Sequence, residues 1–518
     1  MSTSATALPR PRPQLALLIF LLPIVAFFLR LGGAPLFDVD EGAFSEATRE
    51  MFERGDFLST YLNGEHRFDK PILIYWLQAL GYLLFGATEW AFRLPSAVAA
   101  ALWSYATWYF ARERFGANTA LAALAVTATA LGPFAIGRAA TADALLNLLL
   151  ALALFDAWRH LESGRRAPLL RSFVWIGLGV LTKGPIALLV PGTVSFLYCA
   201  SRGEWKRWTR AVFDPVGLVI LAALVVPWYA AALAIHGQAF IDGFILKHNV
   251  ERFTGTLEGH AGSLFYYVLA VPLLLLPWTG PLVATVRHVR ADIATGVRRF
   301  LWVWAAFVVV FFSLSGTKLP HYVLYGATPL FLLIAVHRNE LRRARLHLLA
   351  PTLFLITLPL LPLIFNALAA SDAGNAYYRA QLGLALGEAS PEYYLITIGG
   401  LLVWLWLAAR WNAATWMKVA AAAVIQVVVL STVVVPWAGA VLQGPVKEAA
   451  LLARKIGEPV VAWRYYAPSF SVYRQAITVD RVPAPGELAL TRTDRLPASG
   501  IEMLYSKGGV ALIRKLPD

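Results

Sequence analysis

An acid and a base stand side by side in a short polar stretch of a very apolar chain. Residues 63–70 read NGEHRFDK and end in Asp69 and Lys70, immediately before an apolar run that begins at Pro71. Ionisable groups close to a membrane are costly and are usually functional. Lysine and arginine suit the binding of a phosphate, whereas a carboxylate can orient or deprotonate an acceptor group.

Similar groups recur at intervals along the chain. Asp40 and Glu41 precede this stretch within DVDE. Four later segments read GRAATAD, LTKGP, LKHNVERFTGTLEGH and SGTKLPHY, and they contribute Arg138, Asp143, Lys183, His248, Arg252, His260, Lys318 and Tyr322. If these segments meet on one face of the protein, acids and bases from five loops converge there.

Each of these residues also has a simpler interpretation. The acids at 40–41 can cap a helix, because a helix N-terminus favours negative charge. Lys70 or Lys318 can be an anchor at the membrane surface. Arg138 and Asp143 can form an internal ion pair, and a single loop histidine is usually solvated. It is the collective pattern that favours a functional site.

The composition indicates a helical membrane protein with many spans. The 518 residues are 58% hydrophobic and 15% charged, and the mean hydropathy is +0.61. Apolar windows of about 20 residues follow one another along most of the chain. A single cysteine, Cys199, excludes an internal disulfide framework. The net charge of +14 reflects topology rather than nucleic-acid binding, because about half of the basic residues lie in short segments between apolar runs.

The positions of these basic segments predict thirteen spans, with the N-terminus in the cytoplasm and the C-terminus outside. The first apolar run has no cleavage site and is expected to be retained. The expected spans are 14–31, 92–111, 118–136, 140–158, 172–182, 185–200, 215–235, 263–285, 299–315, 320–337, 348–369, 393–410 and 416–436.

Two helices of the first outer loop, residues 33–91, are expected to lie along the membrane surface. The run 71–86 is short for a span, and counting it as one would invert every later basic cluster. The preceding segment is amphipathic, with Phe44, Ala47 and Met51 on one stripe. The polar turn between these two helices is the stretch NGEHRFDK.

The hydropathy falls after residue 440. A helix is expected at 445–457, with short strands at 459–463, 476–480, 487–492 and 508–515. The predicted organisation is therefore an all-α membrane domain over residues 1–436, followed by a small α/β domain over residues 437–518 outside the membrane.

This arrangement favours glycosyl transfer from a lipid carrier. Nucleotide sugars are absent outside the cytoplasm, so a sugar used there is carried on a lipid, usually a polyprenyl phosphate. Lysine and arginine side chains fixed in advance would stabilise the departing phosphate.

These residues lie in segments that resemble the C-type, multi-span glycosyltransferases, the superfamily of lipid A aminoarabinose transferases and protein O-mannosyltransferases. The similar segments occur in the family's order over residues 37 to about 330. They read DVDEGAFSEATREMFERGDFLSTYLNGEHRFDKPILIYWLQALGYLLFG, EWAFRLPSA, GRAATADALL, GLGVLTKGPIALLVPG, HNVERFTG, LLLLPWTG and TKLPHYVLYGATPL. The resemblance also implies thirteen spans and an outer C-terminal domain.

The resemblance implies roles for individual residues. On the catalytic side it places Asp40 near the acceptor with Glu41 beside it, and it gives Asp143 an orienting role. The residues expected to bind the donor lipid phosphate or to line its cavity are Lys70, Arg252, Arg138, Lys183, Lys318 and Tyr322.

Some relatives also bind a divalent metal, zinc in at least one case. The corresponding ligands here are Asp69 and either His248 or His260, while no other cofactor is implied. The family more often has Glu at position 69 and Pro at position 72, where this chain has Asp69 and Ile72. The shorter acid weakens the assignment of a metal.

The expected function is inverting transfer of a sugar from undecaprenyl phosphate to an acceptor on the periplasmic side of a bacterial inner membrane. The best candidate moves 4-amino-4-deoxy-L-arabinose to lipid A. An alternative is transfer of a hexose or uronic acid to a lipopolysaccharide core, another glycan or a protein hydroxyl. A lipid or solute transporter is the alternative of another class. It is disfavoured because the chain shows no repeated halves and its charges lie at one face.

Overall fold

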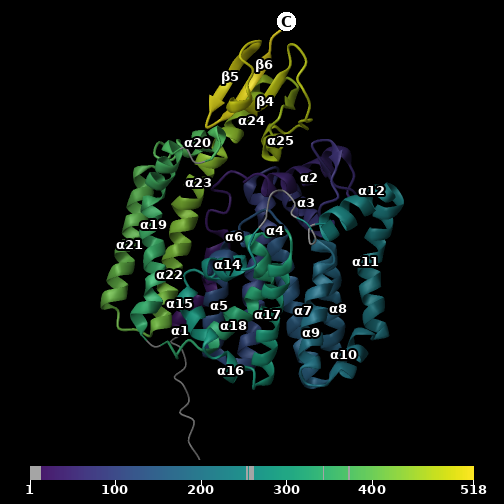
Figure 1. The fold of residues 1–518 in the computed structure, drawn as a ribbon, viewed down its shortest axis with the longest axis vertical. Helices are drawn as coiled ribbons and strands as arrows, with labels where there is room; N and C mark the ends of the chain where they lie inside the picture. The colour runs from purple at the N-terminus through teal and green to yellow at the C-terminus, as the bar shows by residue number, and fades with distance from the viewer. Residues whose placement is uncertain (1–12, 252–254, 256–261, 342, 372–373, 518) are drawn as a thin grey trace, which may run out of the picture.

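The structure is a computed structural model that describes residues 13–251, 255, 262–341, 343–371 and 374–517. Helices form the main body, and a small sheet near the C-terminus lies at one end of it (Figure 1).

The elements of the first half alternate long helices with short connections. They are α1 (Pro13–Phe28), α2 (Asp40–Arg54), β1 (Tyr61–Leu62), β2 (Glu65–His66), α3 (Leu73–Phe85), α4 (Glu89–Phe115), α5 (Ala117–Thr129), α6 (Leu131–Gly137), α7 (Asp143–Ser163), α8 (Arg166–Lys183), α9 (Ile186–Ala200), α10 (Trp205–Val212), α11 (Pro215–His236), α12 (Gln238–Phe240) and the π-helix η1 (Ile241–Glu251).

The second half continues the bundle and ends in the sheet. Its helices are α14 (Tyr266–Leu274), α15 (Thr279–Val286), α16 (Val289–Asp292), α17 (Gly296–Leu314), η2 (Pro320–Gly326), α18 (Ala327–Val336), α19 (Ala344–Ala370), α20 (Ala376–Leu382), α21 (Pro391–Arg410), α22 (Thr415–Val429), η3 (Leu430–Val434), α23 (Val435–Leu442), α24 (Gly444–Ile456), α25 (Pro468–Arg474) and η4 (Thr493–Arg495). Its strands are β3 (Val460–Ala462), β4 (Leu488–Arg492), β5 (Ile501–Lys507) and β6 (Val510–Lys515).

Each expected span coincides with one helix or with two or three consecutive helices, which confirms a multi-span helical fold. Among the described residues, six helices are long and apolar enough to cross a membrane, or seven when α5 and α6 count as one bent span. Two of the expected spans, 118–136 and 263–285, are each broken into two helices. α5 and α6 meet at an angle of 59°, and α14 and α15 are separate helices. Pro133 and Pro277 follow these breaks, and neither can donate the backbone hydrogen bond that would continue the preceding helix.

The first outer loop differs from the prediction in its surroundings. α3 is the expected short helix, but the polar face of α2 is buried: Glu46 and Glu50 are 0% exposed and Arg49 is 5% exposed. α25 of the C-terminal domain packs on this helix. The Arg49 guanidinium donates two hydrogen bonds to the Glu46 carboxylate, at 2.8 and 2.7 Å. The charges of Glu46, Arg49 and Glu50 are therefore satisfied within the protein instead of at the lipid surface.

The C-terminal domain has the expected α/β character. Its four-stranded sheet has the order β3-β4-β6-β5, and only the pair β3–β4 is parallel among these described strands. The expected helix and three of the expected strands are present. The strand expected at 476–480 is reduced to a single bridge between Ala462 and Asp480, while α25 and β5 were not predicted.

Candidate functional site

A polar cavity of about 930 Å³ lies where the first outer loop, the ends of several helices and the C-terminal domain meet. It is lined by Val39, Asp40, Ala43, Phe44, Leu62, His66, Arg67, Phe68, Asp69, Lys70, Thr141, Asp143, Lys183, His248, Leu319, His321, Tyr322, Tyr378 and Tyr466. The predicted loops therefore converge on one cavity, and the C-terminal domain closes part of it through Tyr466.

A tight hairpin presents the stretch from His66 to Lys70 to this cavity. β1 and β2 pair antiparallel across Asn63 and Gly64, whose φ angles are +54° and +92°. Asn-Gly is the preferred sequence for a two-residue turn in which both residues have positive φ. The Gly64 N–H also donates to the Glu50 carboxylate at 3.2 Å, which holds the hairpin on α2.

The first charged cluster surrounds Asp69. Lys70 Nζ lies 2.6 Å from Asp69 Oδ1, and Arg67 donates to Oδ2 at 2.8 Å. His248 Nδ1, from η1, lies 3.0 Å from Oδ1. Burial alone would raise the pKa of Asp69, but the Lys70 charge, the hydrogen bond from His248 and the Arg67 charge hold it well below its usual range. Asp69 is therefore ionised and fixes the positions of the cations beside it.

The second charged cluster surrounds Asp143 at the start of α7. Lys183 Nζ donates to Asp143 Oδ1 at 2.5 Å, and the Tyr325 hydroxyl donates to the same oxygen at 3.0 Å. His321 Nε2 lies 3.7 Å from it. Lys183 is the last residue of α8, which ends there because Gly184 has a φ of +77°. A Cβ on Gly184 would also lie 2.8 Å from the Phe244 ring.

An apolar groove adjoins the polar cavity at these two clusters. This second cavity, of about 240 Å³, is bordered by Asp69, Lys70, Lys183, His248 and Tyr322, all of which also line the polar cavity. Its remaining lining is mostly apolar: Pro185, Ile186, Leu189, Phe244, Phe311, Phe312, Ser315 and Tyr325. Leu189 also borders a third, largely apolar cavity of about 550 Å³ between α8, α9 and α10. Charged groups therefore line one end of an apolar groove, an arrangement suited to an amphiphilic ligand.

Asp40 and Glu41 face different surroundings although they are adjacent. Asp40 is exposed and lines the polar cavity. Glu41 is 4% exposed and accepts two hydrogen bonds from Arg93, at 2.8 and 2.7 Å. It also accepts one from the Ala140 N–H at 2.7 Å. Glu41 therefore links α2 to α4 and to the loop before α7.

Two predicted donor-binding residues lie away from the polar cavity. Arg138 donates to the backbone carbonyls of Ala26, Leu29 and Arg30 at 3.1, 2.8 and 3.2 Å. It therefore holds the end of α1 and is not the ion-pair partner of Asp143. Lys318 is 7% exposed, and its Nζ donates to the Ser315 carbonyl at 2.7 Å. Neither residue lines the polar cavity or the groove formed by the described residues.

Comparisons with known proteins find similarity to glycosyltransferases that use lipid-linked sugars. The family described as dolichyl-phosphate-mannose-protein mannosyltransferase matches residues 69–230. An undecaprenyl phosphate-alpha-4-amino-4-deoxy-L-arabinose arabinosyl transferase of Serratia proteamaculans (strain 568) is 28% identical over 331 residues, which are 63% of this chain and 59% of that protein. The transferase of the same description from Pseudomonas aeruginosa (strain UCBPP-PA14) is 30% identical over 60% of this chain and 56% of its own length. The matches thus span less than two thirds of these relatives.

The fold is similar over nearly the whole chain. The crystal structure of ArnT from Cupriavidus metallidurans bound to undecaprenyl phosphate superposes with a TM-score of 0.80 at 21% identity, covering 97% of this chain and 98% of that one. Its apo form gives a TM-score of 0.78 at 22% identity, with 96% and 97% coverage. This chain is thus similar to aminoarabinosyl transferases in sequence and to ArnT in fold. The predicted resemblance is confirmed, and the chain is a multi-span membrane protein with the ArnT fold.

Two residues predicted for this glycosyltransferase-like site, Arg252 and His260, lie outside the described residues. The metal remains a prediction. Asp69 and His248 are adjacent, as a shared metal would require, but Lys70 and Arg67 already bind the two oxygens of the carboxylate. A divalent cation would have to displace them, so these described residues do not fit a metal as they are arranged. No step below depends on one.

Sequence reasoning did not assign Arg67, Tyr325 or Tyr466 to the site, and it counted His321 among the converging groups without giving it a role. Arg67 and His321 stand within quoted segments, next to residues that were assigned. Tyr325 lies four residues after His321, and on the short helix η2 both reach Asp143. Tyr466 belongs to a loop of the C-terminal domain, which carried no recognisable motif.

Proposed function

We propose that this protein is an inverting glycosyltransferase that moves 4-amino-4-deoxy-L-arabinose from undecaprenyl phosphate to lipid A. The observation that carries the proposal is the junction of the two cavities. There Lys70 and Lys183 stand between a polar cavity and an apolar groove. The names of the relatives support the sugar and its carrier, and the undecaprenyl phosphate bound to ArnT supports the same carrier.

In the proposed complex the donor phosphate lies between Lys70 and Lys183, with Arg67 near and Arg252 as a further ligand. The polyprenyl chain follows the apolar groove past Phe311 and Leu189, and the sugar enters the polar cavity. This placement suits a ligand with a charged head and an apolar chain. The phosphate loses its water where lysine side chains replace it, and the lipid chain leaves water for an apolar groove.

The reaction then proceeds by displacement at the anomeric carbon. An acceptor oxygen forms a bond to that carbon while the bond between the carbon and the phosphate oxygen breaks. The bonding electrons pass to the phosphate oxygen, whose new charge Lys70 and Lys183 stabilise. A lipid A phosphate is already anionic and needs no base, so Asp40 orients the acceptor. Removing one preorganised cation should slow transfer about 10²–10³-fold.

The proposed topology has thirteen spans, a cytoplasmic N-terminus and a periplasmic site in a bacterial inner membrane. It is supported by the basic segments that alternate along the chain. In this topology the residues after the last span, about 437–518, form the periplasmic domain. The helix that contains this boundary continues through η3 and α23 to Leu442.

The proposal is tested by lipid A mass spectrometry in a bacterial strain that makes the donor but lacks its own aminoarabinose transferase. Expression of this protein should add a pentosamine-sized mass to lipid A. Asp40→Ala and Lys70→Met should lose the added mass. Lys507→Met, at a partly exposed site in the C-terminal domain, should retain it.

Immunoblots of the membrane fraction control for the amount of each variant. Unmodified lipid A with the wild-type protein present would contradict lipid A as the acceptor. Full modification by Lys70→Met would contradict the placement of the donor phosphate. A mass increment of hexose or uronic acid size, on lipopolysaccharide core or protein, would identify the alternative substrate.

A further inference from the structure

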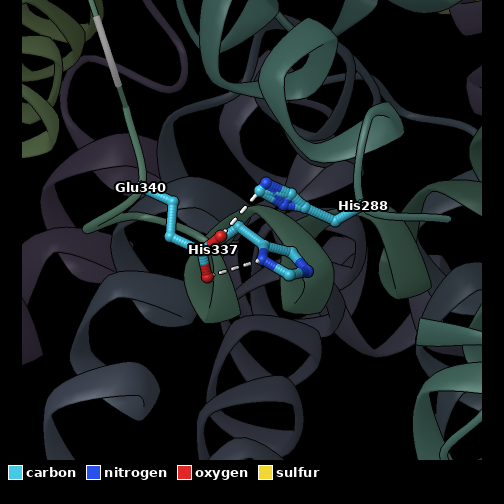
Figure 2. A group of neighbouring side chains, drawn as sticks. All are labelled: His288, His337 and Glu340. Atoms are coloured by element: carbon cyan, nitrogen blue, oxygen red, sulfur yellow. Dashed lines mark hydrogen bonds and ion pairs between the residues drawn. The ribbon is translucent and has the colours of Figure 1, made fainter. Parts of the chain in front are cut away.

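A second group of ionisable side chains lies at the end of the bundle opposite the C-terminal sheet, near α16 (Figure 1). His288 stands between α15 and α16, while His337 and Glu340 follow α18. The Glu340 carboxylate lies beside the two imidazoles, with one oxygen toward each ring (Figure 2). Its Oε2 is 3.0 Å from His288 Nε2, and its Oε1 is 3.1 Å from His337 Nδ1.

The spacing of these atoms is close to that of a metal site. One ligand atom from each of the three residues lies within 4.8 Å of the other two. Ligands bound to zinc at 2.0–2.2 Å in a tetrahedron are about 3.3–3.6 Å apart. The two distances from Glu340 to the imidazoles, 3.0 and 3.1 Å, are a few tenths of an ångström shorter than this spacing, so binding of an ion requires a small rearrangement of the three side chains.

A buried carboxylate orients one of the imidazoles. His337 Nε2 lies 2.9 Å from Asp292 Oδ2, and Asp292 is 0% exposed while His337 is 4% exposed. Trp302 and Arg298 donate to the same carboxylate at 3.0 and 3.1 Å. With Nε2 as the donor to Asp292, His337 presents the lone pair of Nδ1 toward Glu340. A histidine held through its second nitrogen by a carboxylate is the usual outer support of a metal ligand.

Two arginines near the group are occupied by other partners. The nearby Arg298 is paired with Asp292. Arg338 points to other partners, since it donates to Thr119 Oγ1 at 2.8 Å and to the Ala335 carbonyl at 2.7 Å. The Glu340 side chain is 54% exposed and the His288 side chain 25% exposed, which leaves a path for an ion and room for a water ligand.

We propose that His288, His337 and Glu340 bind one divalent cation of the zinc class, separately from the glycosyl-transfer site. Two nitrogens and one carboxylate form a ligand set that zinc accepts with water in the fourth position. The ion would tie the connection between α15 and α16 to the end of α18. That helix continues directly from η2, which carries Tyr322 and Tyr325 of the polar cavity and its adjoining groove. The site is structural, and the proposal does not depend on the sugar or the acceptor.

The test measures metal binding by the purified full-length protein without a polyhistidine tag. The protein in detergent is treated with a chelator, dialysed, and titrated with Zn²⁺ or Co²⁺. The variants His288→Gln and Glu340→Gln change partly exposed side chains, and His160→Gln is the matched control. His160 is partly exposed near the end of α7 and contacts the Arg165 carbonyl.

The wild type and His160→Gln should each bind one equivalent of metal ion. His288→Gln and Glu340→Gln should bind none at this site. Bound Co²⁺ should show the absorption of a tetrahedral site. Asp292→Asn should keep the equivalent with about 10–100-fold weaker affinity. Zinc should raise the apparent unfolding temperature of the wild type but not that of Glu340→Gln. Equal binding by all variants, or none by the wild type, would overturn the proposal and leave the group a hydrogen-bonded cluster.

Discussion

Replacing Lys183 by methionine separates two roles of this side chain: neutralising Asp143 and binding the donor phosphate. The side chains of the pair are 11% and 9% exposed, and the Nζ–Oδ1 distance is 2.5 Å. Removing one partner of a buried ion pair costs about 3–5 kcal/mol, because the other charge stays buried. Here Tyr325 still donates to Asp143, and a hydrogen bond to a charged group contributes about 1.5–3 kcal/mol. We therefore expect a loss at the lower end of the first range, about 3 kcal/mol.

A double-mutant cycle measures this coupling. Lys183→Met and Asp143→Asn should each lower the apparent unfolding temperature of the detergent-solubilised protein. The double variant should lose less than the sum of the two, because the unpaired charge is then absent. Lys507→Met is the control, since its pairs with Glu448 and Glu388 are partly exposed and contribute no more than about 1 kcal/mol.

Transfer activity should not follow stability in this cycle. If Lys183 binds the phosphate, both Lys183→Met and the double variant should transfer about 10²–10³-fold more slowly, even where Asp143→Asn has restored stability. Rates are measured with purified protein and a polyprenyl-phosphate sugar donor. Recovery of transfer in the double variant would refute the donor-binding role and leave Lys183 as the partner of Asp143.

Three further predictions concern the surroundings of the site. Burial raises the pKa of Asp38 from 3.8 to about 7 although Ser469 donates two hydrogen bonds to it. The folded protein therefore retains a proton that the unfolded chain releases, so stability should fall as pH rises from about 4 to 7. Asp38→Asn should flatten this dependence of the unfolding temperature, and an unchanged slope would contradict the assignment. Arg93→Lys should destabilise the fold by about 2–4 kcal/mol, because a lysine cannot bind Glu41 and three backbone carbonyls together; an unfolding temperature like that of the wild type would exclude this role. Tyr466→Ala should slow transfer while the unfolding temperature stays close to that of the wild type, because Tyr466 lines the cavity from the C-terminal domain. Slower transfer together with a clearly lower unfolding temperature would mean a purely structural role.

The sequence predicted the helices and the converging loops because both depend on short-range patterns. Apolar windows locate the helices, and each expected span has a counterpart in the structure. Asp40, Lys70, Asp143 and Lys183 all line the polar cavity. They could be found because each stands where an apolar run begins or ends, and such positions gather at the same end of a bundle.

The partners of these charges could not be predicted from local patterns. Arg138 lies within six residues of Asp143, yet Asp143 pairs with Lys183, forty positions away in the chain. The polar face of α2 looked suited to the membrane surface, but α25, more than 400 residues later, covers it. The group of His288, His337 and Glu340 was not predicted, because α17 and α18 separate His288 from the other two residues in the sequence.

The clusters around Asp69 and Asp143 have the same arrangement, which the residue types alone do not predict. In each, one carboxylate holds a lysine: Asp69 with Lys70, and Asp143 with Lys183. Arg67 and His321 add further donors beside them. A lysine has a flexible stem, so a carboxylate that fixes it before the donor arrives removes a reorganisation step at the moment of transfer. The carboxylates also keep the cavity near neutrality while it holds no phosphate. On this argument the two acids act through the cations they position, and exposed Asp40 is left as the carboxylate that can approach the acceptor.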